Sequence, residues 1–183
     1  MKTIKSICVF CGSSESVDKT YKAIATEIGR AIGKKGLDLV YGGASIGLMG
    51  CVAHGVHEEK GKVIGILPEF FYTKDIGYLD ADELIITQDL RERKAKMDER
   101  SDAFIVLPGG VGTLEEAIEI LSMRQLKLTD KPLVFINTVG FFDKLNETIS
   151  SMIEKNFAKE NIRTLFAMTP DPQTALEYIF NSP

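Results

Sequence analysis

The sequence contains no long hydrophobic run and no block of basic residues. Near its start the only apolar stretch covers residues 7–10, which is too short for a signal-peptide core or a membrane-spanning helix. The formal net charge is -4, with 22 Lys and Arg against 26 Asp and Glu, and this balance disfavours binding to nucleic acid or to an anionic membrane. We therefore expect a cytoplasmic protein whose partner is a small molecule.

Cysteine is scarce, and its spacing gives no disulfide framework. The chain has three cysteines, Cys8, Cys11 and Cys51, and an odd number does not pair completely. Cys8 and Cys11 have the Cys-x-x-Cys spacing of redox motifs. Both lie in a strand-like run, where residues three apart face opposite sides of a sheet, so that a bridge would require the strand to break. Buried, reduced cysteines are the expectation.

Histidine occurs only twice, at His54 and His57, and Glu58 and Glu59 follow directly. Two histidines at this spacing, without further Cys or Asp ligands, are more typical of a protein surface than of a metal site. The sequence also shows no readable Ser-His-Asp grouping. No metal site is predicted.

What the chain does contain is an alternation of short apolar runs with helical stretches. Its 183 residues suit one domain, and 44% hydrophobic and 26% charged residues are ordinary globular values. Several of the apolar runs are continuous, which is typical of parallel strands covered on both faces. The runs predicted to be strands are residues 7–10, 37–41, 63–67, 83–87, 103–107, 133–136 and 165–168. We predict a single α/β domain over residues 1–183, with a doubly wound, Rossmann-like, mostly parallel sheet and helices on both faces.

In such a fold, ligands bind beyond the carboxyl ends of the strands. The first predicted strand is followed by Gly12 and Ser13, whose backbone and hydroxyl groups can approach an anion or a sugar. An ordinary strand-to-helix turn has the same composition, so this loop alone is a weak signal.

The second predicted strand is followed by Gly42 and Gly43, which open a glycine-rich loop that extends to residue 50. It resembles a phosphate loop, but Leu48 and Met49 stand where the Walker lysine and serine would follow. The chain also lacks the G-x-G-x-x-G fingerprint of dinucleotide binding after its first strand. These features favour a nucleotide smaller than ATP or NAD.

The third loop, LPGGVGTLEE at residues 107–116, has the strongest pattern. Gly109, Gly110 and Gly112 permit a sharp turn, and Thr113 is expected to begin a helix over residues 114–127. Successive amides and the positive end of the helix dipole would then converge on one point, which suits a phosphate.

Two charged positions have alternative interpretations. Glu116 either completes a capping box with Thr113 or serves a ligand. Arg93 and Lys94 lie in a helix predicted over residues 89–97, at positions where an inward apolar residue would be expected. They either face the core with a partner or ligand, or belong to a solvated charged face.

The segments 108–116, PGGVGTLEE, and 90–97, close to MxxRKxxM, together with the glycine loop at 42–50, resemble the LOG family. These are cytokinin riboside 5′-monophosphate phosphoribohydrolases long mislabelled as lysine decarboxylases. The resemblance extends over nearly the whole chain. It implies hydrolysis of the bond between base and ribose 5-phosphate in AMP or an N6-modified AMP, without metal or organic cofactor. It also implies a homodimer whose active sites lie near the subunit interface.

By motif position, the resemblance places the catalytic arginine and glutamate at Arg93 and Glu116. We predict from the loops and the resemblance together that substrate binds at Gly12, Ser13, Gly42, Gly43, Lys94, Gly109, Gly110, Val111, Gly112, Thr113, Leu114, Glu115 and Ser122. Val111 replaces an aromatic residue of many relatives, and Ser122 replaces a threonine, so the preferred base stays open.

Two other functions compete with this prediction. A nucleotide sensor or carrier would have the same phosphate site without turnover. A decarboxylase would need a lysine bound to pyridoxal phosphate, and Lys94 has no visible pyridoxal phosphate site beside it.

Overall fold

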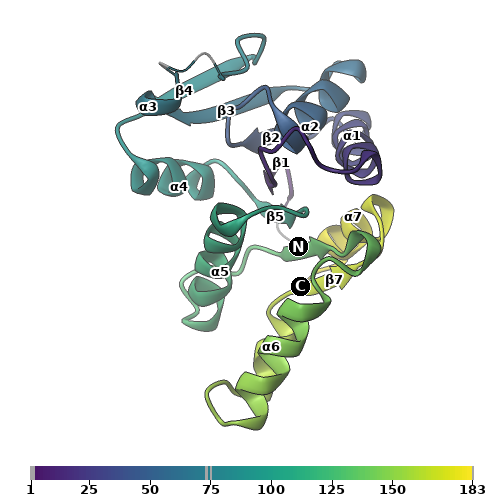
Figure 1. Cartoon of the computed structure of the whole chain (residues 1–183), viewed down its shortest axis with the longest axis vertical. Helices are drawn as coiled ribbons and strands as arrows, with labels where there is room; N and C mark the ends of the chain where they lie inside the picture. The colour runs from purple at the N-terminus through teal and green to yellow at the C-terminus, as the bar shows by residue number, and fades with distance from the viewer. Residues whose placement is uncertain (1–2, 73, 75, 183) are drawn as a thin grey trace.

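The computed structural model describes residues 3–72, 74 and 76–182. Its seven strands form one parallel sheet in the order β4-β3-β2-β1-β5-β6-β7 (Figure 1). The strands are β1 (Ser6–Phe10), β2 (Asp38–Tyr41), β3 (Val63–Pro68), β4 (Glu83–Thr87), β5 (Ala103–Val106), β6 (Leu133–Ile136) and β7 (Ala167–Thr169). The doubly wound α/β fold is confirmed, and each predicted run overlaps one strand. The inner strands are almost entirely buried, whereas the edge strands β4 and β7 are only partly buried.

Helices cover both faces of the sheet, as predicted. The helices are α1 (Lys19–Lys34), α2 (Gly47–Glu58), α3 (Glu69–Tyr72), α4 (Leu90–Glu99), α5 (Val111–Gln125), α6 (Asp143–Glu154) and α7 (Pro172–Asn181). Two short 3₁₀ helices are η1 (Thr138–Gly140) and η2 (Glu160–Thr164). Helices α1, α2 and α7 share a hydrophobic cluster with one face, and α4, α5 and α6 share a second cluster with the other.

The two cysteines of the Cys-x-x-Cys spacing point to opposite faces of β1 and its end. Cys8 belongs to the cluster beneath α4 and α5, whereas Cys11 belongs to the cluster beneath α1 and α2. Both are free and buried, and burial raises the pKa of both thiols. A raised thiol pKa disfavours the reactive thiolate. The expected burial is confirmed for Cys8 and Cys11, whereas Cys51 is only partly buried.

The chain reverses its direction of winding between β1 and β5. Strands β2 to β4 extend the sheet on one side of β1, and β5 to β7 extend it on the other. The loops after β1 and β5 therefore diverge at the centre of the carboxyl edge and open the crevice in which ligands of this fold class bind.

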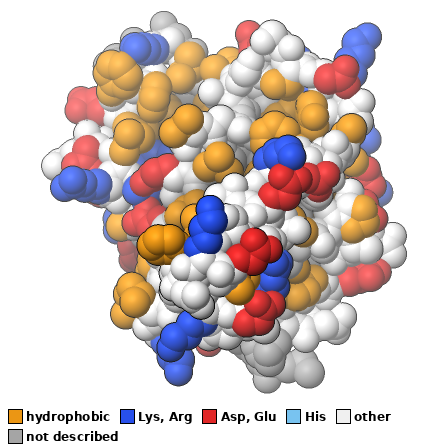
Figure 2. Space-filling view, turned by 60° about the horizontal axis from the view of Figure 1, so that its bottom comes forward, with side chains coloured by type: hydrophobic (Ala, Val, Ile, Leu, Met, Phe, Trp, Pro, Cys, Tyr) orange, Lys and Arg blue, Asp and Glu red, His pale blue; other side chains and the backbone are white. Residues whose placement is uncertain are grey.

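Charge is mixed on the surface. Figure 2 shows acidic and basic side chains interspersed with hydrophobic ones over one face. Within the described part of the chain, no helix has both the length and the apolar character to cross a bilayer.

Candidate active site

The loops after β1, β2 and β5 meet at the carboxyl edge of the sheet. The amide of Gly12 donates to the carbonyl of Pro108 at 3.1 Å. A Cβ on Gly12 would lie 3.2 Å from Cα of Gly109. Gly47, at the start of α2, has φ +60° and lies so close to Ser13 that a Cβ would be 2.4 Å from the carbonyl carbon of Ser13. The sequence prediction that these loops lie together is confirmed.

A cavity of about 260 Å³ lies where these loops meet. Gly12, Ser13, Gly109 and Gly110 contribute to its wall. Four of the predicted substrate-binding residues therefore share one hollow at the switch point of the sheet.

The helix that begins beside this cavity has free amides. Gly110 is the N-cap of α5, and among the described residues no side chain bonds to that cap. Helices α1, α4 and α7 are capped by Asp18, Asp89 and Asp171, whereas α2 and α6 also begin without a side-chain cap. The first amides of a helix have no intrahelical partner, and together with the helix dipole they attract an anion. The uncapped start of α5 is suited to a phosphate.

The start of α5 differs from the sequence expectation. The helix begins at Val111 rather than after Thr113, because Gly110 serves as N-cap, a position where glycine is also accepted. The capping box of Thr113 and Glu116 is therefore wrong: Thr113 already lies inside the first turn, and the Glu116 carboxylate points to another helix. The helix also ends two residues early, at Gln125, because Lys127 adopts a left-handed conformation with φ 59°.

Arg93 and Glu116 form an enclosed ion pair. Asp89 caps α4 by accepting from the amides of Arg91 and Glu92, each at 2.8 Å, and this fixes the first turn. Arg93 then donates from Nε to the carbonyl of Ile66 at 3.0 Å and from Nη1 to Oε1 of Glu116. The Arg93 and Glu116 side chains are 12% and 9% exposed. Arg93 therefore faces the core with a partner, and the solvated-face interpretation is wrong for this residue.

Gly42 lies directly against the guanidinium. A Cβ at this position would be 2.2 Å from Nη2 of Arg93 and 2.8 Å from Sδ of Met49. Gly43 has φ +76°, and a Cβ there would be 3.0 Å from Cβ of Leu67. In the structure these two glycines therefore make room for Arg93 and for the turn after β2.

The pKa of Glu116 lies above the ordinary glutamate value. Burial raises the pKa of this carboxyl, and the nearby Arg93 guanidinium opposes that rise without cancelling it. A carboxyl with a raised pKa exchanges protons closer to neutral pH than an ordinary glutamate, which is the property expected of a catalytic acid or base.

Lys94 lies beside this pair but points into a different hollow. Its ammonium contacts the Glu115 carboxylate and Oε2 of Glu119, the latter at 2.6 Å, and these two bonds raise the pKa of Lys94. A cavity of about 260 Å³ between α4 and α5 is lined by Lys94, Glu116 and Glu119, and also by Arg91 and Met123. Of these five, Glu119, Arg91 and Met123 were not predicted as site residues.

Three predicted substrate-binding residues have side chains that line neither the cavity at the switch point nor the cavity between α4 and α5. Val111 is 85% exposed, and Ser122 is exposed on the outer face of α5. Leu114 packs against the hydrophobic cluster beneath α4, α5 and α6, so its side chain points into the core. Within a single chain, Leu114 can meet a ligand only through its backbone.

The sequence reasoning missed two aromatic residues at the edge of the cavity beside Gly12 and Gly110. Tyr21 and Phe141 both line it, and their rings meet edge to face with centroids 6.1 Å apart. Tyr21 lies in the first turn after the β1 loop, and Phe141 follows β6. The carboxyl ends of parallel strands share one edge of the sheet, and both residues follow such an end in the sequence. Their sequence positions therefore could have indicated that they lie at this edge.

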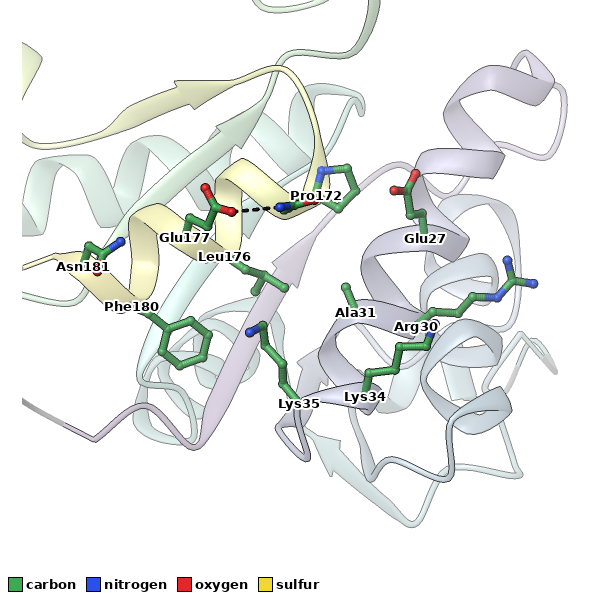
Figure 3. A pocket seen from close by; sticks show the side chains of 11 residues that line it. Glu27, Arg30, Ala31, Lys34, Lys35, Pro172, Leu176, Glu177, Phe180 and Asn181 are labelled. Atoms are coloured by element: carbon green, nitrogen blue, oxygen red, sulfur yellow. Dashed lines mark hydrogen bonds between the residues drawn. The ribbon is translucent and has the colours of Figure 1, made fainter.

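A wider groove, of about 780 Å³, lies between α1 and α7 (Figure 3). The Arg30 and Lys34 side chains turn away from α7 (Figure 3) and pair with Glu58, the last residue of α2, and with Glu59, which follows it. Lys35 lies over the Phe180 ring, 5.0 Å from its centroid. These basic groups are engaged within the protein, and the groove does not share the features of the carboxyl edge.

Comparisons with known proteins give matches over most of the chain. A family model described as "Possible lysine decarboxylase" matches residues 49–179. Cytokinin riboside 5′-monophosphate phosphoribohydrolase LOG5 of Arabidopsis thaliana is 40% identical over 173 residues, which are 94% of this chain and 76% of the relative. Cytokinin riboside 5′-monophosphate phosphoribohydrolase LOG of Oryza sativa subsp. japonica is 39% identical over 166 residues, which are 91% and 69%.

Solved structures share the fold. The molybdenum cofactor binding protein from Rippkaea orientalis superposes with a TM-score of 0.74 at 23% identity, over 98% of each chain. The Moco carrier protein from Chlamydomonas reinhardtii also gives 0.74, at 22% identity over 97% of this chain and 96% of that one. At such identities the likeness concerns the fold alone.

Proposed function

The chain belongs to the LOG family, and from this premise we propose that it is a phosphoribohydrolase that cleaves the N-glycosidic bond of nucleoside 5′-monophosphates. The products are a free base and ribose 5-phosphate. The observation that carries the proposal is the enclosed Arg93–Glu116 pair beside an uncapped helix start.

The substrate extends along the carboxyl edge of the sheet in this proposal. Its 5′-phosphate binds the amides at the start of α5 and the Gly12–Ser13 turn, and its ribose lies toward Arg93 and Glu116. Beyond Arg93, Pro68, Phe71 and Leu90 help to line an apolar groove of about 500 Å³. A groove of this size and character suits the base and an N6 substituent, so both AMP and an N6-modified AMP are candidate substrates.

Cleavage passes through a cation-like ribose. As the bond between C1′ and the base nitrogen breaks, its electron pair leaves with the base, which takes up a proton. Glu116 stabilises the positive charge at C1′ and accepts a proton from the water that attacks this carbon. The guanidinium of Arg93 serves as a fixed positive charge that orients Glu116 or a substrate oxygen.

Lys94 argues against the decarboxylase activity in the family description. A lysine that forms a Schiff base must lose its proton, whereas Glu115 and Glu119 raise the pKa of Lys94. Its amine therefore stays charged and is poorly suited to bond a carbonyl carbon.

We also propose that the protein acts as a homodimer. The outer face of α5 presents Val111 and Ile118, which are 85% and 38% exposed. Ser122 lies on the same face, since residues 111, 118 and 122 follow the helical repeat. A second copy on this face would bring Ser122 toward the partner's site. The three free cysteines suit a reducing compartment, so we place the reaction in the cytoplasm.

The test is direct. The protein is incubated with AMP and with N6-isopentenyl-AMP, and free base and ribose 5-phosphate are measured by chromatography. Release of both products supports the enzyme. A carrier would bind AMP in calorimetry and release no base at any pH, and that outcome would refute the proposal.

A further inference from the structure

A short segment crosses the loop that follows β2. The amide of Tyr78 donates to the carbonyl of Gly43, and the amide of Ser45 donates to the carbonyl of Ile76, each at 2.8 Å. The hydroxyl of Ser45 donates to the same carbonyl of Ile76 at 3.1 Å. Ala44 and Gly77 form an antiparallel bridge between these bonds. We call residues 76–78 the strap, because they hold the Gly43–Ser45 turn on its outer side.

The strap is anchored by the side chain of Tyr78, which is 5% exposed. Its hydroxyl lies 2.8 Å from Nδ1 of His57 on α2, and Nε2 of His57 lies 3.1 Å from Oδ2 of Asp82. The same Asp82 oxygen accepts from the amide of Val63 at 2.8 Å. A chain of polar contacts therefore ties the strap to α2 and to the first residue of β3.

The hydrogen bonds in this chain have a defined direction. The backbone bond from Val63 lowers the pKa of Asp82, so this carboxylate is ionised and can only accept. His57 must then donate from Nε2, and in its neutral form Nδ1 accepts from the Tyr78 hydroxyl. Nδ1 of His54 lies 3.4 Å from that hydroxyl, and its ring meets the Tyr78 ring edge to face. The two histidines thus enclose Tyr78.

This series of polar contacts explains the histidine pair, for which the sequence indicates no role. Among the described residues, no group of three or more His, Cys, Asp or Glu side chains is placed to hold a metal ion. Instead, the two ring nitrogens of His57 form hydrogen bonds with Tyr78 and Asp82.

The turn that the strap holds also contacts the guanidinium of Arg93. Tyr78 bonds to Gly43, and the neighbouring Gly42 lies against the Arg93 guanidinium. A shift of a few tenths of an ångström in this turn would either press on the guanidinium or release it, because a Cβ at Gly42 already has no room. We propose that Tyr78, His57 and Asp82 are positioning residues, which hold the Gly42–Gly43 turn so that Arg93 stays aligned with Glu116.

The proposal rests on the proposed function, and kinetics with AMP test it. Tyr78→Phe and His57→Ala each remove at least one of the hydrogen bonds that link Tyr78, His57 and Asp82. We expect kcat to fall about tenfold, as for small misplacements of a reacting group. KM should stay nearly unchanged, because the phosphate cavity is built on the loops after β1 and β5. His57→Gln should retain activity, since an amide can accept from Tyr78 and donate to Asp82. Tyr178→Phe on α7 is the matched control and should behave as wild type.

A second readout follows Arg93 without relying on turnover. Its Nε–H donates to Ile66, and the nuclear magnetic resonance of that group reports the position of the guanidinium. We expect this resonance to shift in Tyr78→Phe and His57→Ala, and to stay in place in His57→Gln and Tyr178→Phe.

An unmoved Arg93 resonance in Tyr78→Phe and His57→Ala would overturn the proposal, and so would an unchanged kcat in both. Loss of kcat in His57→Gln equal to that in His57→Ala would also overturn it. A wild-type protein that releases no base would refute the proposed function alone, and the Arg93 resonance would then decide the role of the strap.

Discussion

Arg93 of α4 donates a hydrogen bond from Nη1 to Oε1 of Glu116 on α5, and the two side chains are 12% and 9% exposed. Enclosing an ion pair costs desolvation that its attraction repays only partly, so such pairs are weak sources of stability. Glu116 also lines the cavity between α4 and α5. An enclosed pair at a cavity wall is the arrangement that the proposed catalytic role requires.

The first prediction concerns the carboxylate. Glu116→Gln keeps the shape and an acceptor for Arg93, but it removes the negative charge that stabilises the cation-like ribose. We expect the rate of base release from AMP to fall on the order of 100-fold or more, with AMP binding retained in calorimetry. Glu147→Gln, on the exposed side of α6, is the control. Retained turnover in Glu116→Gln would show that another group performs the chemistry.

The second prediction concerns Gly42, which lies against the guanidinium of Arg93. In Gly42→Ala the new Cβ would lie 2.2 Å from Nη2 of Arg93, so the guanidinium must move. We expect kcat for AMP to fall about 100-fold while AMP affinity changes little. The same change in an Arg93→Ala background should cost less than about twofold, because both variants act through one side chain. Full additivity would contradict this arrangement.

The third prediction concerns pH. Burial raises the pKa of Glu116, and the proposed mechanism uses its ionised form. The rate should therefore be lost as pH falls through a midpoint above the ordinary glutamate value of about 4.3. Stability moves in the opposite direction: the folded protein holds this proton more tightly than the unfolded chain, so the free energy of unfolding decreases as pH rises through the same window.

Rate profiles and urea titrations at several pH values measure both trends. In Glu116→Gln this contribution to the pH dependence of stability should disappear. An acidic limb at or below the ordinary glutamate value would exclude Glu116 as the titrating group.

The fourth prediction concerns assembly. Ile118→Arg places a charge on the outer face of α5, where Val111 and Ile118 are exposed. Burying that charge in an interface is costly, so we expect light scattering to show a monomer where the wild type is a dimer. Met152→Arg makes the same change at an exposed residue of α6 and should leave the dimer intact. A wild-type monomer would exclude the proposed homodimer.

Local sequence patterns predicted most of the fold. Each of the seven apolar runs overlaps one strand. Inner strands such as β3 and β5 are covered on both faces and are therefore apolar along their whole length, and the partly buried edge strands β4 and β7 have weaker versions of the same pattern. The glycine-rich loops were recognisable for a similar reason, since Gly47 and Gly109 allow backbone contacts that no side chain would permit. The sequence also pointed to the edge of the sheet at which these loops meet.

The partners of the charged residues were decided by tertiary structure. Thr113 and Glu116 have the spacing of a capping box, yet α5 begins at Val111 and Glu116 turns to Arg93. Whether Arg93 faced solvent or core depended on a carbonyl of β3 and a carboxylate of α5, neither of which is near it in the chain.

The same holds for His57, whose ring bonds Tyr78 and Asp82 across the edge of the sheet. Backbone pattern is a local property and can be read from neighbouring residues. A hydrogen bond between side chains on different elements depends on how those elements pack, and only the folded chain establishes it.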